Sequence, residues 1–322
     1  MQLFLWIFSE IRCYEAPTSP GPSAIFNYSV DKWISVPDSN QLSGEAQNWR
    51  LTLSYDGTDY QGWQVQPGQP TIQAEFQSAL GRVTGESPLP QGSGRTDAGV
   101  HALAQVASFP LRAPIPPENL LRALNRTLPP AIRISEARTV RSTFHARRSA
   151  VAKTYEYRVL PGPDCSPFLA RYVYSCPWSL DLALLQSAAR QFIGEHDFQS
   201  FAATDPDLAH RNREASEESD PKPEALQQEP AKESTIRSIF SSAWERRSVE
   251  SAQLLVYRVR GNGFLHHMVR NLVGTMIDIG RRYLALDEIP RILVARSRAA
   301  AGPTAPARGL FLVSVEYPPE EP

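Results

Sequence analysis

The stretch QGSGRTDAGVHA at residues 91–102 brings three glycines together with an arginine, an aspartate and a histidine. Glycine has no Cβ, so such a segment can turn sharply and lets a bulky partner approach its backbone. Arg95 and Asp97 are two residues apart, and in an extended segment their side chains point to the same side. The stretch predicts an accessible Arg–Asp pair, in which the guanidinium keeps the carboxylate charged as a nucleophile or base requires. The alternative is a glycine-rich loop before a strand, held by an ordinary salt bridge.

Regular elements are predicted on both sides of this loop. Before it, apolar and polar residues alternate over 49–55 as in a half-buried strand, and apolar residues over 72–83 recur at helical spacing. After it, the pattern predicts a strand at 100–109, a helix at 118–128 that stops at a Pro-Pro pair, and a strand at 132–139. Strands interleaved with helices indicate an α+β unit.

A similar alternation follows in the second part of the chain. Its predicted elements are a strand at 151–160, a helix at 181–193, paired strands at 236–246 and 254–260, helices at 264–279 and 288–296, and a closing strand at 310–316. The whole pattern predicts an α+β fold of two related halves, residues 49–148 and 149–317, with a cleft between them.

Two segments differ in composition from these halves. Residues 1–48 show no sustained periodicity, and we interpret them as a flexible N-terminal extension or as the product of a start codon placed too early. Residues 203–234 consist largely of Pro, Ser, Glu, Gln and Ala, which predicts an acidic, disordered insert in the second half. Residues 318–322 are expected to form a short tail.

The net charge of −1 is distributed unevenly along the chain. Residues 1–48 hold five acids against two bases and residues 203–234 nine acids against four bases, so the rest of the chain carries a net charge of +7. Of the 27 cations in this basic body, 26 are arginines and one is Lys153. Because the planar guanidinium suits phosphate oxygens and stacks on bases, the basic body favours a nucleic-acid partner. A GC-rich genome, which favours arginine codons, is the alternative explanation.

Length and composition exclude several classes of protein. With 322 residues, 42% of them apolar and 21% charged, the chain can bury a sizeable core and is neither collagen-like, a coiled coil nor wholly disordered. No stretch approaches the ~20 apolar residues that span a bilayer, and the apolar run at residues 3–8 is too short for a span. Three scattered cysteines make neither a disulfide framework nor a zinc site, so a reducing cytoplasm is the expected location.

A second candidate motif, KTYEY at residues 153–157, lies on a predicted strand. In a strand, Lys153, Tyr155 and Tyr157 fall on one face. Aromatic side chains on such a face can stack on an unpaired base, and a lysine beside them can meet its phosphate. The alternative is ordinary cross-strand packing of the tyrosines.

A third motif, RGNGFLHHMVRN at residues 260–271, leads from a strand into a helix whose free N–H groups favour an anion. His267, Arg270 and Gly274 share a face of the predicted helix. The adjacent histidines suggest a metal, but residues i and i+1 of a helix point about 100° apart, which argues against zinc here. The sequence also contains no phosphate-binding loop, dinucleotide fingerprint or nucleophile elbow. We therefore expect chemistry that needs neither a metal nor a cofactor.

Together these motifs resemble those of the bacterial tRNA pseudouridine synthase A family. The matching segments are YDGTDYQGWQ at 55–64, GRTDAGVHA at 94–102, KTYEY at 153–157 and residues 263–274, in this order. The resemblance spans about residues 49–317 and implies the pseudouridine-synthase fold, with a mostly antiparallel central sheet flanked by helices. It further implies a cytoplasmic homodimer whose basic cleft binds the anticodon arm of tRNA. Two departures from the family are residues 1–48 and the acidic insert.

The resemblance also implies roles for single residues. Asp97 matches the catalytic aspartate, Arg95 and Arg270 match active-site arginines, and Tyr155 matches the tyrosine that contacts the target base. The other motif residues expected to bind the substrate are Lys153, Gly94, Thr96, His267 and Asn271.

The implied reaction turns uridine into its C-glycoside isomer at positions 38, 39 and 40 of tRNA. The N1–C1′ bond breaks, the uracil turns, and C5 joins C1′, after the base has left the helical stack. Asp97 can attack C1′ to form a glycosyl ester or remove a ribose proton to form a glycal, and both routes stay open. On the residues alone, the alternatives are a non-catalytic single-stranded RNA-binding protein and an aspartate-dependent N-glycosidase.

Overall fold

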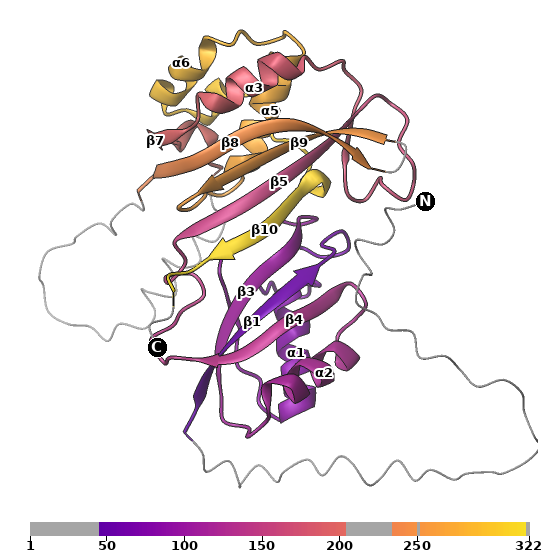
Figure 1. The fold of residues 1–322 in the computed structure, drawn as a ribbon, viewed down its shortest axis with the longest axis vertical. Coiled ribbons are helices and arrows are strands. Elements are labelled where there is room, and N and C mark those ends of the chain that lie inside the picture. Colours follow the sequence, from indigo (N-terminus) through magenta and orange to yellow (C-terminus); the bar gives the residue numbers. More distant parts are fainter. Residues whose placement is uncertain (1–44, 204–233, 250–251, 320–322) are drawn as a thin grey trace, which may run out of the picture.

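The computed structural model describes residues 45–203, 234–249 and 252–319 (Figure 1). Nearly all of the expected N-terminal extension, residues 204–233 of the expected acidic insert and the last three residues of the tail lie outside this part of the chain. The first strand begins at Gln47, so the ordered body starts two residues before the predicted boundary. Among the described residues, none of the helices is long and apolar enough to cross a membrane.

Residues 45–148 contain four strands and two helices. In order they are β1 (Gln47–Tyr55), α1 (Ile72–Thr84), β2 (Gln91–Gly92), β3 (His101–Leu111), α2 (Pro117–Thr127) and β4 (Ile132–Val140). The helix α1 begins where the Thr71 hydroxyl accepts a hydrogen bond from the Ala74 N–H, and it ends at Gly85 in the left-handed conformation. These ends agree with the prediction for residues 72–83.

The part after residue 148 holds the remaining elements. They are β5 (Ala152–Pro161), β6 (Tyr174–Cys176), α3 (Leu182–Arg190), β7 (Gly194–Asp197), β8 (Ile236–Val249), β9 (Ala252–Gly261), α5 (Met268–Gly280), α6 (Glu288–Ala295) and β10 (Leu310–Glu316), with short 3₁₀ turns at Gln199–Phe201, Arg298–Ala300 and Ala307–Gly309.

Within the described ranges, the strands form one mixed sheet in the order β4-β1-β3-β10-β5-β9-β8-β7, with β2 beside β3 and β6 beside β5. Most pairs are antiparallel, whereas β10 runs parallel to β3 and β6 parallel to β5. The α+β class and the mostly antiparallel sheet are therefore confirmed. Figure 1 shows α1 and α2 beside β1, β3 and β4, and α3, α5 and α6 near β8 and β9.

The last strand connects the two parts of the sheet. The strand β10 pairs with β3 on one side and with β5 on the other, so the end of the chain closes the gap between the first and second predicted halves. That the halves are related to each other stays a prediction. The sheet nevertheless brings the loop after β2 and the segment before α5 close enough to form one site.

Two predicted elements have different ends in the structure. The helix α5 begins at Met268, four residues later than expected, because His267 adopts the left-handed conformation with φ of 59° and caps the helix. The helix α3 ends at Arg190, and the chain then turns at Gly194, with φ of 109°, into β7. The strand β7 has the polar sequence GEHD, in which no apolar alternation indicates a strand.

Candidate active site

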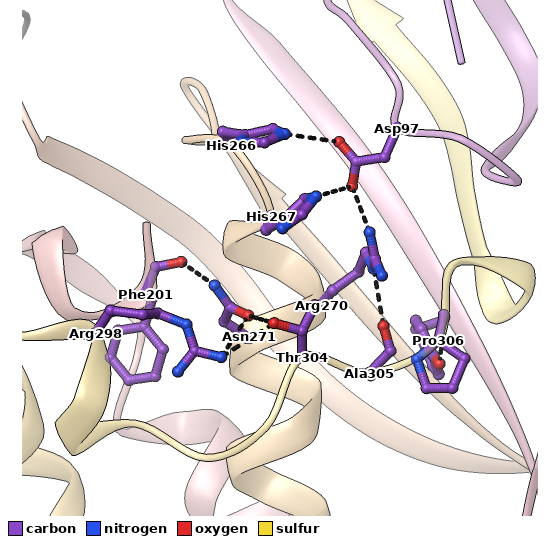
Figure 2. A network of polar contacts seen from close by, with 11 residues as sticks. Asp97, Phe201, His266, His267, Arg270, Asn271, Arg298, Thr304, Ala305 and Pro306 are labelled. Atoms are coloured by element: carbon purple, nitrogen blue, oxygen red, sulfur yellow. Dashed lines mark hydrogen bonds and ion pairs between the residues drawn. The ribbon is translucent and has the colours of Figure 1, made fainter. Parts of the chain in front are cut away.

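Asp97 lies in the loop between β2 and β3 and points toward the beginning of α5 (Figure 2). Its carboxylate Oδ2 is 2.8 Å from Nη1 of Arg270, which donates a hydrogen bond to it. The side chain of Asp97 is 18% exposed, so the carboxylate is partly sheltered but still accessible. A charge-assisted hydrogen bond of this length fixes the orientation of the carboxylate. Asp97 therefore pairs with Arg270 of α5, whereas the sequence pattern named Arg95, which is exposed on the loop.

The loop that carries Asp97 rests on the motif YDGTDYQGWQ at residues 55–64. A Cβ on Gly57 would lie 2.0 Å from the carbonyl oxygen of Val100, and one on Gly62 would lie 2.4 Å from that of Thr96. Both positions thus need glycine because the two backbones touch. Hydrogen bonds reinforce the contact, since the Trp63 N–H donates to Thr96 O at 3.0 Å. This motif therefore fixes the backbone of the loop that carries Asp97.

The other end of the loop is tied to the sheet. The Ser93 N–H donates to Val106 O at 2.7 Å, and the Gln105 amide donates to Gly94 O at 2.9 Å. Nζ of Lys153, from β5, donates to Ser93 O at 2.6 Å. The same Nζ would lie 3.2 Å from a Cβ at Gly94. Lys153 and Gly94 are therefore neighbours, and the lysine holds the loop as well as facing the site.

Thr96 does not reach outward from this loop. It is 7% exposed, and its hydroxyl lies 2.8 Å from the Tyr55 hydroxyl in a buried hydrogen bond. Its hydroxyl thus helps to hold the loop in place, and the expectation that Thr96 binds the substrate stays a prediction.

Arg270 is held on the opposite side by the segment before β10. Its Nε donates to Ala305 O at 2.8 Å, while the Ala305 N–H donates to Arg270 O at 3.1 Å. One turn further along α5, a Cβ on Gly274 would lie 1.6 Å from Pro303 O, so only glycine lets this segment cross the helix. The guanidinium thus makes two hydrogen bonds at once, one to the backbone and one to Asp97.

Asn271 supports Arg270 from a fully buried position. Its amide nitrogen donates to Phe201 O at 2.7 Å, and its amide oxygen accepts from Arg298 Nη2 at 3.0 Å and from the Thr304 hydroxyl at 2.7 Å (Figure 2). Asn271 is 0% exposed and joins three segments of the chain at the start of α5. The expectation that it binds the substrate stays a prediction.

His266 and His267 also face the carboxylate of Asp97. Nε2 of His266 is 3.5 Å from Oδ1, and Nε2 of His267 is 3.3 Å from Oδ2. Their rings are 4.0 Å apart between centroids with an angle of 32° between the planes. The prediction that adjacent histidines would diverge assumed that both lie on the helix, and it is wrong because α5 starts only after His267. Burial lowers the pKa of His267, although the charge of Asp97 opposes this shift.

Tyr155 and Lys153 of β5 form the next part of the site. Tyr155 is 8% exposed, and its ring meets that of Phe264 edge to face at 5.0 Å between centroids. Burial, with smaller effects of Tyr55 and the Asp97 carboxylate, raises the pKa of the Tyr155 hydroxyl above its ordinary value. Burial and the nearby charges of Arg147 and Arg237 lower the pKa of Lys153 to about 8. Tyr155 and Lys153 thus lie near the loop that carries Asp97, a position that the strand pattern did not predict.

Sequence reasoning missed several residues that surround or support the Asp97 carboxylate. The scaffold role of Gly57 and Gly62, the approach of His266 and the network around Asn271 depend on contacts between segments far apart in the chain. The signal available for the first of these was the glycine spacing in YDGTDYQGWQ, since tight turns and close backbone contacts both favour glycine. Arg298 and Thr304 stand in no motif that we singled out.

Comparisons with known proteins find similarity to one family. A family model described as tRNA pseudouridine synthase matches residues 52–147 and 224–318. The tRNA pseudouridine synthase A of Solibacter usitatus is 51% identical over 269 residues, which cover 83% of this chain and 98% of that protein. The proteins of the same name from Moorella thermoacetica and Bacillus pumilus are 42% and 39% identical, each over 83% of this chain and 98% of their own length.

Proposed function

The chain belongs to the tRNA pseudouridine synthase A family, and on this basis we propose that Asp97 is the residue with which it isomerises uridine to pseudouridine in tRNA. The chain is thus a tRNA pseudouridine synthase, an isomerase. One observation carries the assignment of Asp97: its partly exposed carboxylate is oriented by Arg270 where the loop after β2 meets α5. The network around Asn271 and Ala305 fixes that arginine in turn.

The reaction balances without a second substrate. The N1–C1′ bond breaks and a C5–C1′ bond forms, while C5 loses a hydrogen as a proton and N1 gains one. Asp97 is suited to either route, by attack on C1′ or by removal of a ribose proton. In both, Arg270 donates to Oδ2, which leaves Oδ1 without this hydrogen bond and able to act on the substrate.

The target base has to leave the stack before Asp97 can reach its sugar. Tyr155 is placed to support the flipped uracil, because its ring is held edge to face by Phe264 and lies beside the catalytic loop. Lys153 and Arg95 supply cations for the backbone phosphates, in keeping with the charge of the basic body. Gly94 and His267 line the same region and complete the proposed contacts.

The finer details rest on the family resemblance. We propose that the target uridines are those at positions 38, 39 and 40 in the anticodon arm, and that the enzyme works in the cytoplasm as a homodimer. Mapping of the modified positions on tRNA tests the first point, and the mass of the full chain in solution, measured by light scattering, tests the second.

Replacement of the proposed catalytic residue tests the assignment. With tRNA labelled with tritium at uridine C5, we expect the wild-type enzyme to release tritium and Asp97→Asn to release almost none, because the change keeps the shape but removes the carboxylate charge that either route requires. Asp287→Asn, at an exposed position before α6, is the control and should match the wild type.

Three outcomes separate the candidate functions. Tritium release indicates isomerisation, free uracil indicates an N-glycosidase, and tRNA binding without either product indicates a non-catalytic RNA-binding protein. Turnover of Asp97→Asn within tenfold of the wild type would refute the role of Asp97.

A further inference from the structure

We propose that Asp97, His266 and His267 form a binding site for a zinc ion, and that the bound ion inhibits the enzyme by occupying the catalytic carboxylate. The three side chains each offer one ligand atom, and these atoms all lie within 4.8 Å of one another. The binding of the ion depends only on this geometry. The inhibition rests in addition on the proposed function of Asp97.

The separation between His266 and Oδ1 of Asp97 is close to that in a tetrahedral zinc centre, and His267 lies within reach of the same place. With zinc bonds of about 2.0–2.1 Å to nitrogen and oxygen, tetrahedral angles place two ligand atoms roughly 3.3–3.4 Å apart. Nε2 of His267 is 3.3 Å from one oxygen of Asp97, and Nε2 of His266 is 3.5 Å from the other. These separations are longer than the 2.7–3.2 Å of ordinary N–H···O hydrogen bonds. The three ligand atoms are thus close enough together for one ion to contact all three side chains.

The backbone at His267 brings the two imidazoles together. Its left-handed conformation, with φ of 59°, turns the chain just before α5, and the rings of His266 and His267 lie 4.0 Å apart between centroids, tilted by 32°. As Figure 2 shows, both side chains point toward Asp97 from the same side. Non-glycine residues adopt this conformation only rarely, so the arrangement is a specific feature of the fold.

The type and number of ligands favour zinc among the common ions. Two imidazole nitrogens and one carboxylate are a zinc ligand set, whereas magnesium and calcium prefer oxygen ligands. Three protein ligands leave a position open for water, and each side chain is 18–29% exposed, so an ion can enter from solvent.

The surroundings limit the affinity of this site. Nη1 of Arg270 is 2.8 Å from Oδ2 of Asp97, and its positive charge repels a cation placed beside that oxygen. Oδ1, on the side of His266, faces away from this hydrogen bond and is the oxygen available to the ion. The arrangement thus fits an ion that binds reversibly and is displaced when the target uridine enters, rather than a resident cofactor.

Cobalt(II) is a suitable probe, because it takes the same ligands as zinc and its visible absorption reports the coordination directly. We expect the tag-free, full-length enzyme to show a saturable absorption band with one equivalent of cobalt, which zinc abolishes. His266→Ala and His267→Ala should each weaken cobalt binding at least about tenfold, the usual cost of disturbing a metal site. His196→Ala, on β7, is the matched control and should bind like the wild type. Absence of the band from the wild type, or its persistence in both histidine variants, would overturn the site.

Enzyme assays test the inhibition separately. In excess magnesium, zinc should raise the apparent KM for tRNA in the wild type and in His196→Ala, a chelator should reverse the effect, and His266→Ala should respond much less. If cobalt binds at the site but zinc leaves turnover unchanged, the inhibitory role is wrong.

If Asp97→Asn is inactive while the wild type shows no cobalt band, the site is refuted and the proposed function stands. A cobalt band together with a fully active Asp97→Asn enzyme would instead refute the proposed catalytic role and support the site.

Discussion

The two sides of the active site are held in different ways. The loop that carries Asp97 is fixed mainly through backbone atoms: Gly57 and Gly62 touch its carbonyl groups, and main-chain hydrogen bonds join it to Trp63 and β3. The start of α5 is fixed mainly through side chains, with Asn271 at the centre of a buried network that includes Arg298 and Thr304. The position of the loop therefore depends on close contacts between backbones. The position of the start of α5 depends on the hydrogen bonds of a few polar side chains.

This contrast explains how one carboxylate can be placed accurately by two segments 173 residues apart in the chain. Backbone contacts leave the side chains of the loop free for catalysis, because the residues that hold it need only be small. Side-chain networks position a long residue such as Arg270, whose own backbone cannot define where the guanidinium lies. Substitutions in the loop and substitutions at the start of α5 should consequently lower stability and activity for different physical reasons.

The largest loss of stability is expected on the loop side. Gly57→Ala places a Cβ at 2.0 Å from Val100 O, and since that atom belongs to the backbone the loop has to move. We expect a loss of about 3 kcal/mol in the free energy of unfolding, measured by urea denaturation, together with loss of activity. The control is Gly68→Ala, at φ of 70° with no atom within 4 Å of the added Cβ, for which only about 1 kcal/mol is expected. Equal losses in the two variants would mean that the close approach does not constrain the loop.

The next effect is expected on the helix side. Asn271→Leu keeps the approximate size of the side chain but leaves groups of Phe201, Arg298 and Thr304 without their partner, which should cost about 2 kcal/mol. Activity should fall further than stability alone explains, because Arg270 is the adjacent residue. Asn119→Leu, at an exposed position of α2, is the matched control and should stay within about 0.5 kcal/mol of the wild type. An unchanged unfolding transition for Asn271→Leu would show that the network does not support the helix.

A smaller effect is expected from Lys153, which touches both the loop and the proposed phosphate path. Since its pKa in the folded protein is about 8, tRNA affinity should fall as the pH rises through 8, by about tenfold or less for one cation. Lys153→Arg should keep its affinity across this range, and Lys153→Met should be weak throughout. Stability should respond in the opposite direction: between pH 8 and the ordinary lysine pKa the unfolded chain binds more protons, so the contribution of Lys153 to stability rises with pH. A wild-type affinity without this pH dependence, measured by filter binding, would contradict the role of the lysine.

The smallest effect is expected for the loss of one hydroxyl. If Tyr155 holds the flipped uracil with its ring, Tyr155→Phe should weaken tRNA binding by less than about 1 kcal/mol, whereas Tyr155→Leu should cost roughly 1–3 kcal/mol. If the hydroxyl instead takes the C5 proton, Tyr155→Phe should bind normally but release tritium slowly. Wild-type behaviour of both variants would make Tyr155 a packing residue of β5.

Much of the fold is visible in the sequence because its elements follow local periodicity. The alternation at 49–55 and the helical spacing at 72–83 predict β1 and α1 almost to the residue, since one face of each element has to be buried. Short polar strands such as β7 carry no such pattern, because pairing with β8 alone makes them strands. The motif around Asp97 and its family resemblance likewise indicate the chemistry without any knowledge of contacts between distant segments.

Residue patterns along the chain are therefore sufficient for the α+β class and most element positions, and together with the family resemblance they name the candidates Asp97, Arg270, Tyr155 and Lys153. Contacts between distant segments were needed to establish which arginine meets Asp97, that Thr96 and Asn271 serve the fold, and that His266 and His267 converge on one carboxylate. The physical reason is that these outcomes depend on β10 closing the sheet and on the left-handed backbone at His267. Both are long-range or conformational effects that residue spacing along the chain does not encode.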